Sequence, residues 1–166
     1  MAYEGVRAQR FRDTCMDNVH QMGEGLKLYS LDWDDVLPKD NQWMDYSAGY
    51  MDSGQYGTKN NPEAFHCPSA QLNFKIANQN IYGYSFNSWL SKMNTNLLTT
   101  PEATIMEYDS TNLSRDATDK VTSIAWKRHL DGANVGYVDG HAHWLAAKFG
   151  LPKSDRIEVS SPIGAN

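Results

Sequence analysis

The N-terminal fifth of the chain has the hydrophobic pattern of one long amphipathic helix. From about Glu4 to Leu31 there is no proline, and apolar residues recur at every third or fourth position. They form one stripe, whereas the opposite side is charged and polar. We expect the helix to end between Asp32 and Pro38 and to depend on packing, because Gly23 and Gly25 weaken an isolated helix. The stripe consists of Cys15, Val19, Met22, Leu26, Tyr29 and Trp33.

The second half of the chain changes to the two-residue alternation that is typical of β-strands. The pairs Asp131-Gly132 and Asp139-Gly140 lie between strand-like segments, and this dipeptide favours two-residue hairpin turns. Together they predict a C-terminal β-meander of three strands. The strand candidates are Tyr82 to Asn87, Thr104 to Tyr108, Thr122 to Arg128, Ala133 to Val138 and His141 to Ala147.

Two-residue turns also predict which side chains of the meander share a face. Trp126 would lie opposite Tyr137, and Val135 opposite Trp144. The predicted fold class is therefore α+β, a pilin-like arrangement with the long N-terminal helix packed on an antiparallel sheet. The face expected to meet the helix carries Ile124, Trp126, Ala133, Val135, Tyr137, Ala142, Trp144 and Ala146. The face expected to meet solvent carries Lys127, His129, Asn134, His141 and His143.

The length of 166 residues fits a single domain covering 1–166, with enough chain to bury a hydrophobic core. Residues 39–61 are polar and aperiodic and are interpreted as an irregular loop insertion. The aromatic residues of this loop fit either a contact surface for protein or carbohydrate or a minor hydrophobic cluster. They are Trp43, Tyr46, Tyr50 and Tyr56.

Charge and hydropathy exclude some partners. Fifteen Lys and Arg against 20 Asp and Glu give a net charge of -5, which does not favour binding to nucleic acid or anionic lipid. A mean hydropathy of -0.62 and the lack of a long apolar run predict no spanning helix in these residues. Taken literally, this pattern predicts a cytoplasmic protein. The Met1-Ala2 start, which leads straight into a helix, is also typical of a chain trimmed of an upstream segment.

The two cysteines, Cys15 and Cys67, lie far apart in the sequence and form no Cys-x-x-Cys motif. This excludes a zinc ribbon and a thioredoxin-like redox motif. In an exported domain such a pair is most often a disulfide, whereas in a cytosolic protein it is two buried thiols.

Histidines near the C-terminus suggest a metal or acid-base site. Imidazole and carboxylate groups at close spacing are typical of zinc and general-base chemistry. In the predicted register, however, His129 and Asp139 lie at opposite ends of a strand, about 15 Å apart. His141 and His143 share a face and are weak candidates for a metal patch, because a zinc site normally takes a third protein ligand. With no recognisable nucleophile motif, we expect no catalytic residues.

Two acidic groups offer the hard oxygen ligands that calcium prefers. Neither has the spacing of a defined calcium loop, and acidic residues of this kind more often shape turns. Calcium therefore remains an option, and no other cofactor is expected. The groups are Asp32, Asp34 and Asp35, and Asp109, Asp116 and Asp119.

A longer motif gives a family resemblance. The segment from His129 to Asp139-Gly140, with nine intervening residues, resembles the His-x9-Asp-Gly motif of prepilin-like, type II secretion pseudopilin-like proteins with the prepilin-type processing-associated C-terminus. Its residues are His129, Gly132, Asn134, Asp139 and Gly140. Weaker similarities follow the family's order at 9–38, 65–68, 82–87 and 101–109, although Asn87 lies later after Tyr82-Gly83 than in the family pattern.

The resemblance implies a non-catalytic structural subunit of a type II secretion or type IV pilus-like filament. It implies a cleaved leader, a methylated N-terminus and an inner-membrane helix, none of which these residues contain, with the head periplasmic or at the cell surface. Its partners would be other pilin-like subunits and the secretion or pilus assembly machinery. It also implies a disulfide between Cys15 and Cys67, which would close a loop of about 50 residues and contribute ~4 kcal/mol. The alternative is an extracytoplasmic glycan- or protein-binding module of the same fold.

Overall fold

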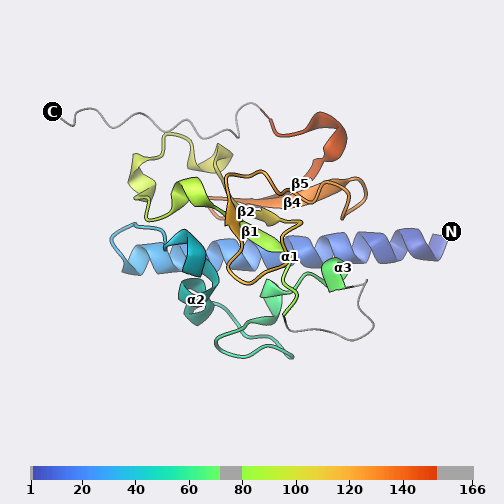
Figure 1. Cartoon of the computed structure of the whole chain (residues 1–166), viewed down its shortest axis with the longest axis horizontal. Helices are drawn as coiled ribbons and strands as arrows, with labels where there is room; N and C mark the ends of the chain where they lie inside the picture. The colour runs from blue at the N-terminus through green and yellow to red at the C-terminus, as the bar shows by residue number, and fades with distance from the viewer. Residues whose placement is uncertain (1, 72–79, 153–166) are drawn as a thin grey trace.

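The long N-terminal helix is the axis of the molecule. In the computed structural model, which describes residues 2–71 and 80–152, α1 spans Ala2–Asp32 as the pattern predicts. It runs along the longest dimension, with the sheet on one side and α2 and α3 on another (Figure 1). The stripe from Cys15 to Leu26 is completely buried, and Tyr29 is nearly so. Trp33 lies beyond the end of the helix and is 56% exposed, so placing it on the buried stripe was wrong.

The sheet has five strands in the order β3-β1-β2-β4-β5. The pairs β1-β2, β2-β4 and β4-β5 are antiparallel, whereas β3 runs parallel to β1. The α+β class is therefore confirmed, but the sheet is mixed rather than antiparallel, and β3 was not predicted. The strands are β1 (Tyr84–Asn87), β2 (Ile105–Asp109), β3 (Thr118–Asp119), β4 (Gly132–Tyr137) and β5 (Ala142–Ala146).

The three-stranded meander was wrong, because the segment 122–128 is not a strand. Ile124 makes one isolated bridge to Ser110, and the chain then turns. Leu130 and Asp131 both have positive φ, at 54° and 56°. The C-terminal part of the sheet is thus a single hairpin of β4 and β5.

The register of this hairpin also differs from the prediction by one residue. Val135 lies opposite His143, and Asn134 lies opposite Trp144. The Tyr137 N–H donates to the His141 carbonyl, so the loop between them has three residues rather than two. Gly140 in this loop has a φ of 94°, the kind of conformation that a glycine allows in three-residue hairpin loops.

The face of β4 that meets the helix is also the opposite of the predicted one. The side chain of Asn134 bonds the helix backbone, and a Cβ on Gly136 would lie 2.9 Å from Cγ1 of Val19. Asn134 and His129, predicted to meet solvent, are instead buried, whereas Lys127, His141 and His143 are exposed. The predicted core residues of β4 form a second cluster on the opposite face of the sheet. Its buried members are Ile105, Tyr108, Ile124, Ala133, Val135 and Tyr137.

The region 39–61 is partly helical and contributes to the main core. Trp43 and Met44 are completely buried, and the Trp43 indole donates to the Ala117 carbonyl at 3.1 Å. In its first half α2 (Trp43–Ser47) lies between η1 (Asp40–Gln42) and η2 (Ala48–Tyr50). The other short helices are η3 (Glu63–Phe65), α3 (Pro68–Gln71), η4 (Ser88–Leu90), η5 (Thr95–Leu97), η6 (Pro101–Ala103) and η7 (Ala147–Phe149).

Some aromatic residues of this loop are buried and others are exposed, so they fit partly the hydrophobic-cluster interpretation and partly the contact-surface interpretation. Trp43 belongs to the core, whereas Tyr46 and Tyr50 pack around Tyr29 with ring centroids 5.6 Å and 6.0 Å away. Tyr56 is 74% exposed. Among the helices of the described residues, none has an apolar stretch that would span a lipid bilayer.

Candidate functional site: a buried cluster of two cysteines, a histidine and an aspartate

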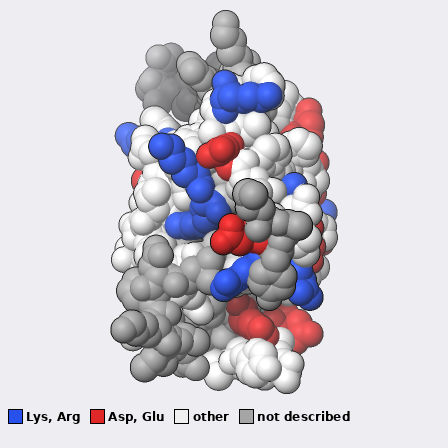
Figure 2. Space-filling model, turned by 90° about the vertical axis from the view of Figure 1, so that its right-hand side faces the viewer, with Lys and Arg blue, Asp and Glu red and all other residues white. Residues whose placement is uncertain are grey.

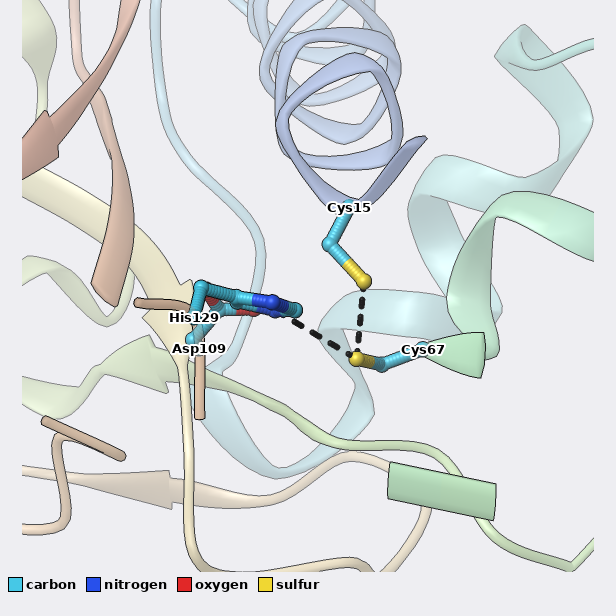
Figure 3. Close-up of side chains that lie close together, drawn as sticks. All are labelled: Cys15, Cys67, Asp109 and His129. Carbon is cyan, nitrogen blue, oxygen red and sulfur yellow. Dashed lines mark hydrogen bonds and ion pairs between the residues drawn. The ribbon is translucent and has the colours of Figure 1, made fainter. Parts of the chain in front are cut away.

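Four side chains from four separate segments meet beneath the long helix. Cys15 projects from α1 towards Cys67, which immediately precedes α3 (Figure 3). Asp109 is the last residue of β2, and His129 lies in the turn before β4. All four are at most 1% exposed. The packing of α1 on the sheet therefore creates this cluster, because no two of its members are neighbours in the sequence.

The contacts within the cluster are short. The two sulfur atoms are 2.8 Å apart, and both cysteines are free thiols. Nε2 of His129 lies 3.8 Å from Sγ of Cys67 and 3.4 Å from Oδ2 of Asp109. The structure thus brings together the two cysteines that the family resemblance pairs, while the disulfide itself stays a prediction.

Neighbouring groups set the protonation of the cluster. Burial would raise the pKa of Cys67, but hydrogen bonds with Cys15 and His129 outweigh burial and lower that pKa to about 6. Burial would lower the pKa of His129, but Asp109 and Cys67 raise it to about 9. Burial, reinforced by Cys67, raises the pKa of Cys15. These shifts favour a thiolate at Cys67 and a protonated imidazole at His129 near neutral pH, with the Cys15 thiol beside them.

Backbone and side-chain hydrogen bonds hold these groups in place. The Asn134 N–H donates to Oδ2 of Asp109 at 2.7 Å, and the His129 carbonyl accepts from the Trp144 indole at 2.8 Å. Nδ1 of His129 lies 3.5 Å from the Ser69 hydroxyl. The other carboxylate oxygen of Asp109, Oδ1, is buried and has no hydrogen-bond partner within the described part of the chain. A buried acceptor without a partner is costly, which makes this oxygen a candidate ligand atom.

The cluster is closed to large molecules. A cavity of about 450 Å³ lies nearby and is lined by Ser69, Ala70 and Arg128 among others, but by none of the four cluster residues. A thiolate–imidazolium pair is the chemistry of a nucleophilic cysteine, yet a nucleophile must reach its substrate. This burial suits an ion or a redox change better than an organic substrate.

The remaining motif residues have packing roles. Gly132 lies under the Trp144 ring, where a Cβ would come within 2.4 Å of Cε2. Asn134 binds the helix backbone, and Gly140 sits in the hairpin loop with its Cβ position 2.6 Å from Glu24 Oε1. Asp139 accepts hydrogen bonds from the backbone and ring of His141. The motif thus shapes one hairpin and its contact with α1, while His129 joins the cluster.

His141 and His143, the weaker metal candidates, do not meet at a common site in the described part of the chain. The His141 ring stacks on Tyr137 with centroids 4.3 Å apart and contacts Asp139, while His143 lies exposed on β5. Neither histidine belongs to a group of three or more ligating residues among those described.

The acidic groups considered for calcium are mostly engaged in hydrogen bonds. Asp32 accepts from Tyr50, and Asp35 accepts from Asn96. Asp116 accepts from the Met44 N–H, and Asp119 accepts from several hydroxyl groups, while Asp109 belongs to the buried cluster. Calcium binding remains a prediction without a specific contact to support it.

The chain was also compared with known proteins. No protein-family model matches the chain, and no curated protein or solved structure shows significant similarity to it.

Proposed function

We propose that the chain is the head of a pilin-like or pseudopilin-like filament subunit and that it acts structurally rather than as an enzyme. The observation that carries the proposal is the asymmetry of α1. Its first turns extend beyond the sheet, and residues 4–7 are all exposed, whereas one face of its later turns is buried in the core (Figure 1). A helix held at one end and free at the other provides a surface on which copies of the same subunit pack.

The roles of the motif residues support this proposal. Gly132, Asn134 and Gly140 are buried residues of the hairpin and of its contact with α1. A motif that fixes the angle between helix and sheet suits a subunit whose helix must be presented in one direction. The same geometry gives no support for a substrate pocket at the motif.

The surface at the projecting end suits side-by-side packing of identical chains. Figure 2 views this end, where basic and acidic side chains are interspersed. Val6 is an apolar side chain there that is 55% exposed, and Arg12 pairs with Asp13 at 2.7 Å where α1 reaches the sheet. Mixed charges avoid the repulsion that a surface of one sign would create between copies.

The family resemblance extends this proposal to the cell. The head would lie in the periplasm or at the cell surface, with the inner membrane as anchor. Its partners would be other pilin-like subunits and the secretion or pilus assembly machinery. Nucleic acid is not a proposed partner.

Disulfide trapping in cells tests the proposal. In the full-length gene product, Val6→Cys places a thiol on the projecting turns, and Lys148→Cys places a matched exposed thiol on η7. After mild oxidation of whole cells, we expect covalent dimers with Val6→Cys and monomers with Lys148→Cys. Dimers in equal amounts from both variants, or in neither, would contradict the proposal.

One observation favours the glycan-binding alternative. Tyr29, Trp33 and Tyr46 line an open cavity of about 400 Å³ together with Lys39 and Lys92. Tyr29 and Trp33 stack at 5.6 Å, and the exposed rings of Trp33 and Tyr46 provide flat apolar surfaces for sugar rings.

Glycan binding would make Trp33 the essential residue. Isothermal titration with soluble peptidoglycan fragments and neutral oligosaccharides tests it, with Trp33→Ala as the variant and Trp89→Ala, another exposed tryptophan, as the control. Saturable binding that Trp33→Ala abolishes and Trp89→Ala retains would establish this function. The same heat signal from wild type and from both variants would reject this function.

A further inference from the structure

We propose that Cys15, Cys67, Asp109 and His129 form a zinc-binding site in the reduced protein. One ligand atom from each residue lies within 4.8 Å of all the others, and all four residues are buried. This inference goes beyond the filament proposal and does not depend on it, because it concerns how the head is held together.

The donor set has the composition of a structural zinc site. Two sulfurs, one imidazole nitrogen and one carboxylate oxygen provide the four ligands that zinc takes in tetrahedral geometry. Thiolate and imidazole ligands select zinc over the hard ions magnesium and calcium. Because four protein ligands leave no open position and the cluster is buried, the site would be structural rather than catalytic.

The distances are close to those of a tetrahedral site. Bonds of ~2.3 Å to sulfur and ~2.0 Å to nitrogen or oxygen place ligand atoms about 3.3–3.8 Å from one another. The separation of 3.8 Å between Cys67 Sγ and His129 Nε2 fits this range, and so does 3.4 Å between His129 Nε2 and Asp109 Oδ2. The sulfurs, at 2.8 Å, would have to move apart by roughly 1 Å.

A disulfide would explain only half of the cluster. It uses the two sulfurs and leaves a buried imidazole and a buried carboxylate beside them without a role in the bond. A zinc ion would use His129 and Asp109 as well as both cysteines. The disulfide and the metal require the same sulfurs, so they are mutually exclusive states of one site.

The charges around the site can accommodate the metal. Two thiolates and one carboxylate exceed the charge of Zn²⁺ by one, and the Arg128 guanidinium lies close enough to favour the charged form of Cys67. Arg128 is itself fixed by the Gly83 carbonyl at 2.7 Å. Binding would displace protons from the thiols and the imidazole, as is usual for such sites.

Cobalt substitution tests the site directly. The chain is reduced, stripped of metal and kept without oxygen, and Co²⁺ is added as an optical probe for the zinc position. We expect one equivalent to bind with an intense thiolate-to-cobalt charge-transfer absorption, and Zn²⁺ to displace it. Saturating Zn²⁺ should raise the melting temperature by on the order of 10 °C relative to the chelated protein.

Matched variants identify the ligands. Cys67→Ser and His129→Gln should lose or weaken the charge-transfer band, whereas the double variant His141→Ala/His143→Ala should keep it. The wild-type spectrum alone reports thiolate ligation, so the test stands even where a ligand variant fails to fold. The proposal is overturned by a reduced wild type with two titratable thiols and no such band. It is equally overturned if the double variant His141→Ala/His143→Ala no longer binds zinc.

Discussion

Asn134 in β4 donates its side-chain amide to the Arg12 carbonyl in α1, with the two atoms 3.1 Å apart and the residues 122 positions apart in sequence. This bond fastens the helix to the sheet at a motif position. We expect Asn134→Ala to lower the free energy of unfolding by about 1–2 kcal/mol, because it removes a buried hydrogen bond. Urea denaturation measures the loss. Asn60→Ala, at an exposed turn, should cost less than about 0.5 kcal/mol, and equal losses would argue against the fastening role.

Gly132 is predicted to tolerate no side chain. A Cβ there would lie 2.4 Å from the Leu145 carbonyl oxygen and equally close to the Trp144 ring. Gly132→Ala should therefore destabilise the protein by about 2–3 kcal/mol through overpacking. Gly49→Ala is the matched control, since its Cβ would meet no atom within 4 Å, and its melting temperature should stay near that of wild type. An equally stable Gly132→Ala variant would contradict this packing.

Glu107 is a buried carboxyl group without a hydrogen-bond partner for either oxygen in the described structure. Burial raises its pKa well above the usual range, which favours the neutral acid between α1 and the sheet. Glu107→Met, similar in volume and apolar, should raise the free energy of unfolding by about 1–2 kcal/mol. Thermal unfolding measures the gain. Exposed Glu102→Met should have little effect, and a destabilised Glu107→Met would show that the carboxyl has a partner or a role.

Asp119 gives the molecule an acid-sensitive contact. Burial would raise its pKa, but hydrogen bonds from Ser123, Tyr108 and Thr122 outweigh burial and lower that pKa. The folded-state pKa of Asp119 therefore lies below the unfolded value of about 3.9. The ionised carboxylate stabilises the fold at pH values above the unfolded pKa, and this stability is lost as pH falls through the folded pKa.

The corresponding variant is Asp119→Asn. At pH 7 its free energy of unfolding should be about 1 kcal/mol lower than that of wild type. The loss is small because Asp119 is partly exposed and water screens its interactions. The difference should shrink as pH falls below the unfolded pKa of about 3.9 and close once pH is below the lowered folded pKa, where the wild-type carboxylate is protonated too. Chemical denaturation across pH measures it, with Asp17→Asn on the exposed side of α1 as the control. A difference that does not change with pH would contradict this mechanism.

The elements with a clear periodic pattern of apolar residues could be predicted from the sequence. The buried stripe from Cys15 to Leu26 follows the helical period, and four of the five predicted strands exist. The register of β4 and β5 could not be predicted, because an Asp-Gly pair serves both two-residue and three-residue loops. The face of β4 that meets the helix could not be predicted either, because all six residues of this strand are buried, and Asn134 lies against the helix instead of in solvent.

The buried cluster had no signal in local spacing. Cys15 and Cys67 are 52 positions apart, and His129 is a further 62 residues beyond Cys67. Only the packing of α1 on the sheet brings them together. One hint lies in β2, where Glu107 and Asp109 place acidic groups at alternate positions of an otherwise apolar strand, a pattern that suggests a buried polar feature on one face.

The most direct measurement of the central claim is electron cryomicroscopy of assemblies that contain the full-length gene product. Membranes of the natural host are extracted gently, and particles are captured with an antibody against this head. The filament account predicts helical assemblies in which copies of α1 pack side by side with the sheets facing outward. Captured particles that contain only single, separate copies of the chain would contradict it.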